Sequence, residues 1–105
     1  MAWFYLFIAG ICEIIWAIGL KYTQGFTRIW PSIITVIVMS LSIFYLSRAI
    51  QSIPIGTAYA IWTGIGVIGT TALGILLFGE SSDPLRLCCI FLIMAGIAGL
   101  RLLSS

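Results

Sequence analysis

The chain carries one carboxylate in a setting where charge is costly. Glu13 is the only acidic residue before Glu80, and the rest of the run 2–20 has no charged side chain. As a helix, that run of about 19 residues is roughly 28 Å long, close to the hydrocarbon thickness of a bilayer. A charged side chain near the middle of a membrane span costs on the order of 3 kcal/mol by insertion scales. We therefore interpret Glu13 as a functional proton or cation site.

Other side chains that suit a cation site recur near this glutamate. Trp16 and Ala17 follow Glu13 by three and four residues. Gly10 precedes it by three, so all four residues share one face of a helix. The faces of aromatic rings attract a desolvated cation by about 2 kcal/mol. A carboxylate flanked by such rings favours a planar or quaternary cation.

Two later segments add residues of the same kind. Ser42 stands near the middle of the second apolar stretch, and Tyr59 and Trp62 share a face of the third. We place Trp16, Tyr59 and Trp62 at the site. The alternative role, interfacial anchoring, suits the other aromatic residues: Trp3, Tyr5, Tyr22 and Trp30. For Ser42 two interpretations remain open, because its hydroxyl either orients the carboxylate or bonds to helix backbone, as membrane serines do.

Composition excludes several other classes of protein. Of the 105 residues, 62% are hydrophobic and 8% are charged, which is far from the composition of a soluble domain. A net charge of +2 makes nucleic acid a poor partner. There is no histidine, and the cysteines, Cys12, Cys88 and Cys89, lie in apolar stretches without zinc spacing. We expect no metal, no cofactor and no enzyme active site.

The elements that position these residues are four apolar spans in the lipid bilayer. Pro31, Pro54 and Pro84 each stand just before or at the start of a span, where the first turn of a helix tolerates proline. No segment alternates with the period of a transmembrane strand, which excludes a barrel. The predicted fold is an all-α membrane protein with one four-helix transmembrane domain over residues 1–105. Its helices are expected at about 3–20, 31–47, 55–78 and 85–103.

Four short helices cannot easily enclose both a site and a pathway, which favours an oligomer. Ala95, Gly96 and Gly99 make a small-residue face on the fourth span that a partner helix can approach closely. In the third span, Gly64 and Gly66 form a candidate flexing point. The alternative is that membrane helices are simply rich in glycine. Gly10 is a further small residue suited to close packing.

The distribution of basic residues hardly determines which way the chain is oriented in the membrane. With four spans, one side of the membrane holds Arg48 and Arg101, and the other holds Lys21, Arg28 and Arg86. A difference of one basic residue hardly satisfies the positive-inside rule. Either other features orient the chain weakly, or it inserts both ways. In the second case, oppositely inserted copies can form one antiparallel dimer.

Two segments resemble the small multidrug resistance family of transporters. They are GICEIIWAIGLK at 10–21, followed by GFTR at 25–28, and PIGTAYAIWTGIG at 54–66. The Trp16-Ala17 pair after the glutamate is similar to the guanidinium exporter subtype, whereas the multidrug subtype usually has Gly-Thr there. The resemblance covers essentially the whole chain, although the fourth span is less distinctive.

This resemblance implies proton-coupled export of guanidinium across the bacterial inner membrane by an antiparallel homodimer. Protons and guanidinium would compete for the paired Glu13 carboxylates. Trp16, Ser42, Tyr59 and Trp62 would form the surrounding pocket. In the fourth span, the resemblance supports a dimer contact.

Three other functions remain open. A broad-specificity quaternary ammonium or multidrug proton antiporter has the same fold, and side-by-side transport of guanidinium and a tetraalkylammonium separates the two. A channel would show flux without a fixed coupling ratio. An accessory subunit would be inactive when reconstituted alone.

Overall fold

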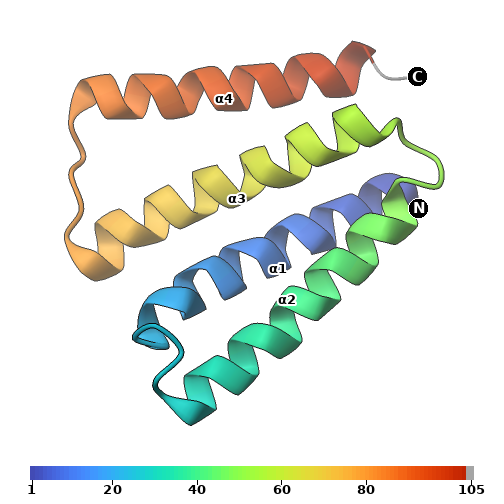
Figure 1. The fold of residues 1–105 in the computed structure, drawn as a ribbon. Coiled ribbons are helices and arrows are strands. Elements are labelled where there is room, and N and C mark those ends of the chain that lie inside the picture. Colours follow the sequence, from blue (N-terminus) through green and yellow to red (C-terminus); the bar gives the residue numbers. More distant parts are fainter. Residues whose placement is uncertain (104–105) are drawn as a thin grey trace.

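The structure is a computed structural model that describes residues 1–103. Over this range the chain forms four α-helices: α1 (Ala2–Tyr22), α2 (Ile29–Ala49), α3 (Ile55–Phe78) and α4 (Pro84–Leu103) (Figure 1). Each helix is 20 to 24 residues long and apolar enough to cross a membrane. The prediction of an all-α protein with four helices suited to spanning a membrane is confirmed.

The first two helices are longer than the apolar spans that predicted them. α1 continues past Lys21, and α2 begins two residues before Pro31. Lys21 is stable in the last turn of α1 because a positive charge interacts favourably with a helix C-terminus. Its ammonium group also lies 4.8 Å from the centre of the Phe78 ring. The connection between the two helices is therefore only 23–28.

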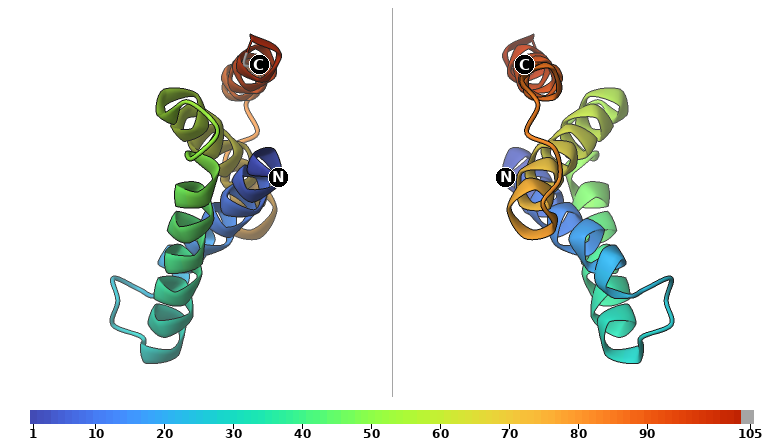
Figure 2. Two further views of the ribbon diagram at one scale, coloured as in Figure 1. Left: turned by 90° about the vertical axis from the view of Figure 1, so that its right-hand side faces the viewer. Right: turned by 90° about the vertical axis from the view of Figure 1, so that its left-hand side faces the viewer.

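The helices form a thin layer rather than a closed bundle. α1 packs against both α2 and α3, α2 and α3 have little contact, and α4 packs chiefly along α3. The order across the layer is thus α2, α1, α3, α4 (Figure 1). End-on views place α4 at one edge, away from α2 (Figure 2). The Cα atoms extend over 43 × 34 × 16 Å. Because α1 is central, side chains from both neighbouring helices reach its middle.

Glycines allow α1 and α3 to approach closely. A Cβ atom at Gly10 would lie 2.7 Å from Cγ2 of Ile65, nearer than real Cβ atoms come to a neighbour. A Cβ atom at Gly69 would overlap the side chain of Ile14. Each helix thus contributes a glycine on which a branched side chain of the other rests. Gly10 therefore lies at a packing contact in this structure.

The other small residues singled out in the sequence fall into two groups. Gly64 and Gly66 lie in an unbroken part of α3, and both are buried; Gly64 meets an isoleucine of α4. On α4, by contrast, no described atom lies within 4 Å of a Cβ position at Gly96 or Gly99, and Ala95 is exposed. The flexing of α3 and a partner contact on α4 both stay predictions.

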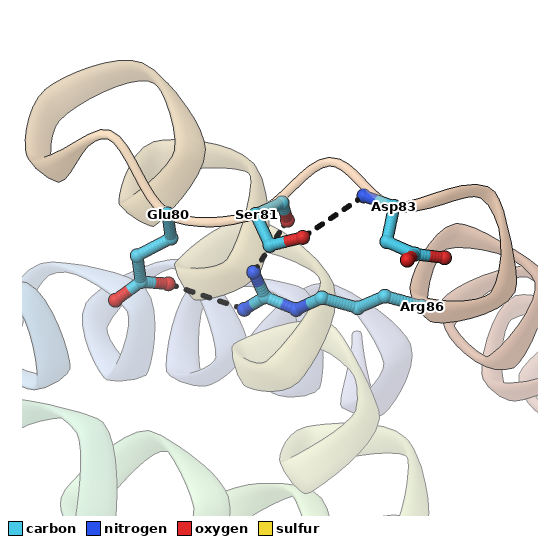
Figure 3. Close-up of polar contacts among 4 residues, drawn as sticks. All are labelled: Glu80, Ser81, Asp83 and Arg86. Carbon is cyan, nitrogen blue, oxygen red and sulfur yellow. Dashed lines mark hydrogen bonds and ion pairs between the residues drawn. The ribbon is translucent and has the colours of Figure 1, made fainter.

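Polar contacts around Arg86 fix the connection between α3 and α4 (Figure 3). The guanidinium forms an ion pair with Glu80 at 3.1 Å and donates a hydrogen bond to the Ser81 carbonyl at 2.6 Å. The Asp83 carboxylate accepts a hydrogen bond from the Leu85 N–H at 2.8 Å and so caps the first turn of α4. These contacts shape the tight return from α3 into α4.

A methyl group at Gly69 is expected to weaken the contact between α1 and α3. In Gly69→Ala the new atom would lie within 2.5 Å of two carbons of the Ile14 side chain, so this side chain must shift. Overpacking of this kind costs about 1–3 kcal/mol. Gly56→Ala is the control for adding a methyl group to α3, because a Cβ atom at that position meets no neighbouring atom within 4 Å. Thermal unfolding in detergent micelles should show a lower midpoint for Gly69→Ala alone. Equal midpoints would contradict this account of the packing.

Candidate functional site

Glu13 lies near the middle of α1 and faces α3. A Cβ atom at Gly66 would overlap the Glu13 carboxyl group, so the missing side chain at Gly66 provides the space that this group occupies. The Oε1 atom is shielded from solvent and has no hydrogen-bond partner within residues 1–103. A carboxylate oxygen in this position is unfavourable unless a proton or a cation satisfies it. The geometry thus fits the proton or cation site that the sequence predicts.

A shallow, largely open cavity of about 210 Å³ lies beside the carboxyl group. Its lining comes from α1 and from one face of α3, where the residues are three, four and seven positions apart. The hydroxyls of Thr63 and Thr70 are buried there without a hydrogen-bond partner in the described part of the chain. The lining residues are Glu13, Ala17, Thr63, Gly66, Val67 and Thr70.

A second polar cluster lies one turn toward the start of α1. Ser42 is fully buried, and its hydroxyl donates a hydrogen bond to the carbonyl of Ala9 at 2.7 Å. The indole N–H of Trp62 lies 3.0 Å from the Ser42 hydroxyl oxygen and 3.2 Å from the Ala9 carbonyl. In an α-helix that carbonyl also accepts the amide N–H of Glu13, four residues on. The cluster therefore anchors the stretch of backbone that carries the carboxylate.

Trp16 and Tyr59 lie at the margins of this arrangement. Trp16 follows Glu13 by one turn, and its indole nitrogen is buried with no partner within residues 1–103. Tyr59 is 58% exposed, and its ring centre lies 5.6 Å from that of Trp62. Neither residue lines the cavity beside Glu13. In a single chain they extend the site along α1 and α3 without closing it.

The contacts of Ser42 distinguish its two interpretations. Its hydroxyl bonds to helix backbone, and that backbone belongs to α1 rather than to its own helix. In this structure its hydroxyl contacts the Ala9 carbonyl and makes no direct hydrogen bond to the Glu13 carboxylate. Sequence reasoning missed the two threonines of the cavity, Thr63 and Thr70. Their spacing of seven, with Gly66 between them, is the pattern that would have indicated them.

Comparison with known proteins finds relatives along nearly the whole chain. The chain matches the family model of the Small Multidrug Resistance protein over residues 1–93. A guanidinium exporter of Yersinia pseudotuberculosis serotype I (strain IP32953) is 58% identical over 104 residues, 99% of this chain and 100% of that protein. Guanidinium exporters of Citrobacter freundii and Salmonella typhimurium are each 59% identical over 102 residues, 97% of both chains.

Helices that can span a membrane and relatives named as exporters define a multi-pass membrane transporter, not an enzyme. The chain belongs to the small multidrug resistance family.

The Ser42 and Trp62 side chains should be energetically coupled. Because the indole N–H contacts the Ser42 hydroxyl, Ser42→Ala and Trp62→Phe remove parts of one network, and their effects on the free energy of unfolding should not add. Hydrogen bonds between membrane helices average about 0.6 kcal/mol and reach about 1.7 kcal/mol. We expect a coupling in that range from a double-mutant cycle in mixed micelles. The pair Ser47→Ala and Trp62→Phe should be additive, since Ser47 bonds only within α2. Additivity in both cycles would refute the coupling.

Proposed function

We propose that the chain exports guanidinium across the bacterial inner membrane in exchange for protons, with Glu13 as the shared site. The observation that carries this proposal is the shielded carboxyl oxygen of Glu13, which has no partner in the described chain and lies beside a cavity of about 210 Å³. The relatives named guanidinium exporters support the choice of substrate. Guanidinium is planar, and its paired N–H donors match a carboxylate in bidentate fashion.

Competition between proton and cation is sufficient for exchange. A protonated carboxyl group has lost the charge that attracts guanidinium, and a bound guanidinium blocks protonation of the same oxygens. If the site opens to one side of the membrane at a time, export of one guanidinium requires that protons enter in its place. The two Glu13 carboxylates of a dimer would provide the charge for both species.

Aromatic side chains supply the remaining attraction in this proposal. The Trp62 ring is held by its N–H contacts with Ala9 and Ser42, and the Tyr59 ring packs beside it. A guanidinium near these rings gains cation–π attraction of about 2 kcal/mol when desolvated. Trp16, one turn from Glu13, would narrow the pocket against bulky quaternary ammonium ions.

The proposal includes an antiparallel homodimer with dual topology. A layer only 16 Å thick along its shortest extent leaves the site incomplete in one chain. α4 has no buried residue among those described, and its small residues Gly96 and Gly99 are uncovered. This edge suits close approach of a second copy. The near balance of basic residues between the two sides supports insertion in both orientations.

Replacement of Glu13 should abolish exchange. In proteoliposomes, we expect Glu13→Gln to lose both guanidinium-driven proton release and at least nine-tenths of guanidinium uptake, because glutamine carries neither charge nor titratable proton. Glu80→Gln is the matched control, since Glu80 lies in the exposed connection after α3. Uptake by Glu13→Gln at the wild-type rate would reject this role. Transport of tetrapropylammonium as fast as guanidinium by the wild type would instead identify a broad-specificity antiporter.

Variants that insert in only one orientation should each supply only one of the two chain orientations that the proposed antiparallel dimer needs. Two lysines appended after residue 105 should place the termini of most copies in the cytoplasm, and two lysines inserted in the connection 23–28 should do the reverse. Each variant alone should lose activity, and coexpression should restore it. Labelling of a single introduced cysteine, in a variant without Cys12, Cys88 and Cys89, reports orientation. Wild-type protein labelled from only one side would refute the antiparallel dimer.

A further inference from the structure

Arg28 is the one basic side chain that has no charged or aromatic partner within residues 1–103. Three other basic groups lie over aromatic rings, at 4.4–5.8 Å from the ring centres, and a fourth forms an ion pair with Glu80. These four residues are Lys21, Arg48, Arg101 and Arg86. Arg28 is exposed and stands directly before the first residue of α2. Its guanidinium is therefore available to an anion from outside the chain.

Arg28 is also one of the lining residues of an open groove between α1 and α2. The groove has a volume of about 480 Å³. The two helices come close at its base, because a Cβ atom at Gly19 would lie 2.5 Å from Oγ1 of the buried Thr35. Apolar side chains from both helices form the walls, among them Ile18, Ile34 and Val38. The groove thus has a charged end and an apolar interior.

The length of the groove corresponds to one leaflet of a bilayer. Arg28 and Val38 are ten residues apart, about 15 Å along a helix. The hydrocarbon core of a bilayer is about 30 Å thick, so each leaflet contributes about half of that. Tyr22 and Trp30 line the groove near Arg28, and such rings are enriched at the level of lipid headgroups. An acyl chain that begins beside Arg28 therefore reaches the middle of the bilayer near Val38.

Charge at the Arg28 end favours an anionic headgroup. A guanidinium matches a phosphate in bidentate fashion. The first turn of α2 has no acidic side chain, and the N-terminus of a helix carries a partial positive charge. The sequence has no Asp or Glu between Glu13 and Glu80, so the connection 23–28 offers no carboxylate that competes for Arg28.

The groove lies away from the Glu13 carboxyl group and from α4. Ile15, Ile18 and Tyr22 follow Glu13 by two, five and nine residues, which places them about 140–200° around α1 from it. α4 lies at the other edge of the layer, beyond α3 (Figure 1). A dimer contact through α4 would therefore leave the groove facing the bilayer.

We propose that this groove binds an anionic phospholipid, with the phosphate on Arg28 and one acyl chain between α1 and α2. This inference goes beyond the proposed transport function and does not depend on it. A zwitterionic lipid carries a cationic group that offsets its phosphate, so Arg28 selects headgroups with a net negative charge. One arginine near a membrane surface changes the affinity for anionic lipid by about fivefold.

Lipid binding to the full-length protein in detergent tests the contact with the headgroup. Native mass spectrometry gives the Kd for dioleoyl phosphatidylglycerol and for dioleoyl phosphatidylcholine, which have the same chains. The wild type should bind phosphatidylglycerol about fivefold more tightly, and Arg28→Gln should lose this preference. Arg48→Gln is the matched control, because it removes the same charge from the last turn of α2, and it should keep the preference. A wild type without preference, or an Arg28→Gln variant that retains it, would overturn the inference.

A second pair of variants tests the place of the acyl chain. Ile33 and Ile34 are both exposed on α2, but only Ile34 lines the groove. Ile34→Trp adds bulk that clashes with a chain in the groove and should raise the Kd for both lipids roughly threefold. Ile33→Trp should leave both values unchanged. Equal Kd values in the two variants would overturn the groove as the site. Loss of cross-linked dimer in Ile34→Trp alone would overturn it too, because a second copy of the chain would then be the occupant.

Discussion

A carboxyl group in the middle of an apolar helix needs space and a partner, and the contact between α1 and α3 provides the space. Glu13 projects toward Gly66, where the absence of a side chain leaves room for its carboxyl group. Gly10 and Gly69 bring the two helices together on either side. This close approach leaves an open cavity beside the carboxyl group, lined mainly by apolar atoms. No described group of the chain forms a hydrogen bond with the Oε1 atom, which leaves this atom available to a proton or a cation.

The Ala9 carbonyl joins three helices one turn from that group. Ser42 of α2 and Trp62 of α3 both reach this one atom of α1. In surroundings with few competing donors, such a shared acceptor restrains the backbone. The restraint acts at the residue whose carbonyl pairs with the Glu13 amide. A cluster of paired polar groups therefore stands beside a cavity where the Glu13 Oε1 atom has no hydrogen-bond partner in the described chain.

The thin layer leaves α4 with few contacts in one chain. α1 is covered on two sides by α2 and α3, but α4 adds contact only along α3 and buries none of its described residues. Trp16 and Tyr59 do not line the cavity beside Glu13 in this structure, and their place in a substrate pocket stays a prediction. A second copy of the chain is the partner that we propose to bring such residues around a bound cation. The membrane-spanning helices are thus the structural unit, and a pair of chains is the proposed functional unit.

The sequence by itself determined the four apolar helices, the isolated charge at Glu13 and the family, because hydrophobic span length and residue spacing are properties of the local chain. The same spacing predicted Ser42 at a depth similar to that of Glu13, and Trp62 on one face of a helix with Tyr59. It did not determine their partners, since a helical period shows which residues share a face but not which face meets which helix. Only the tertiary structure decided that Ser42 bonds to the Ala9 carbonyl rather than to the carboxylate. It also decided that Thr63 and Thr70 join Glu13 at one cavity, because that depends on how closely the glycines let α1 and α3 approach.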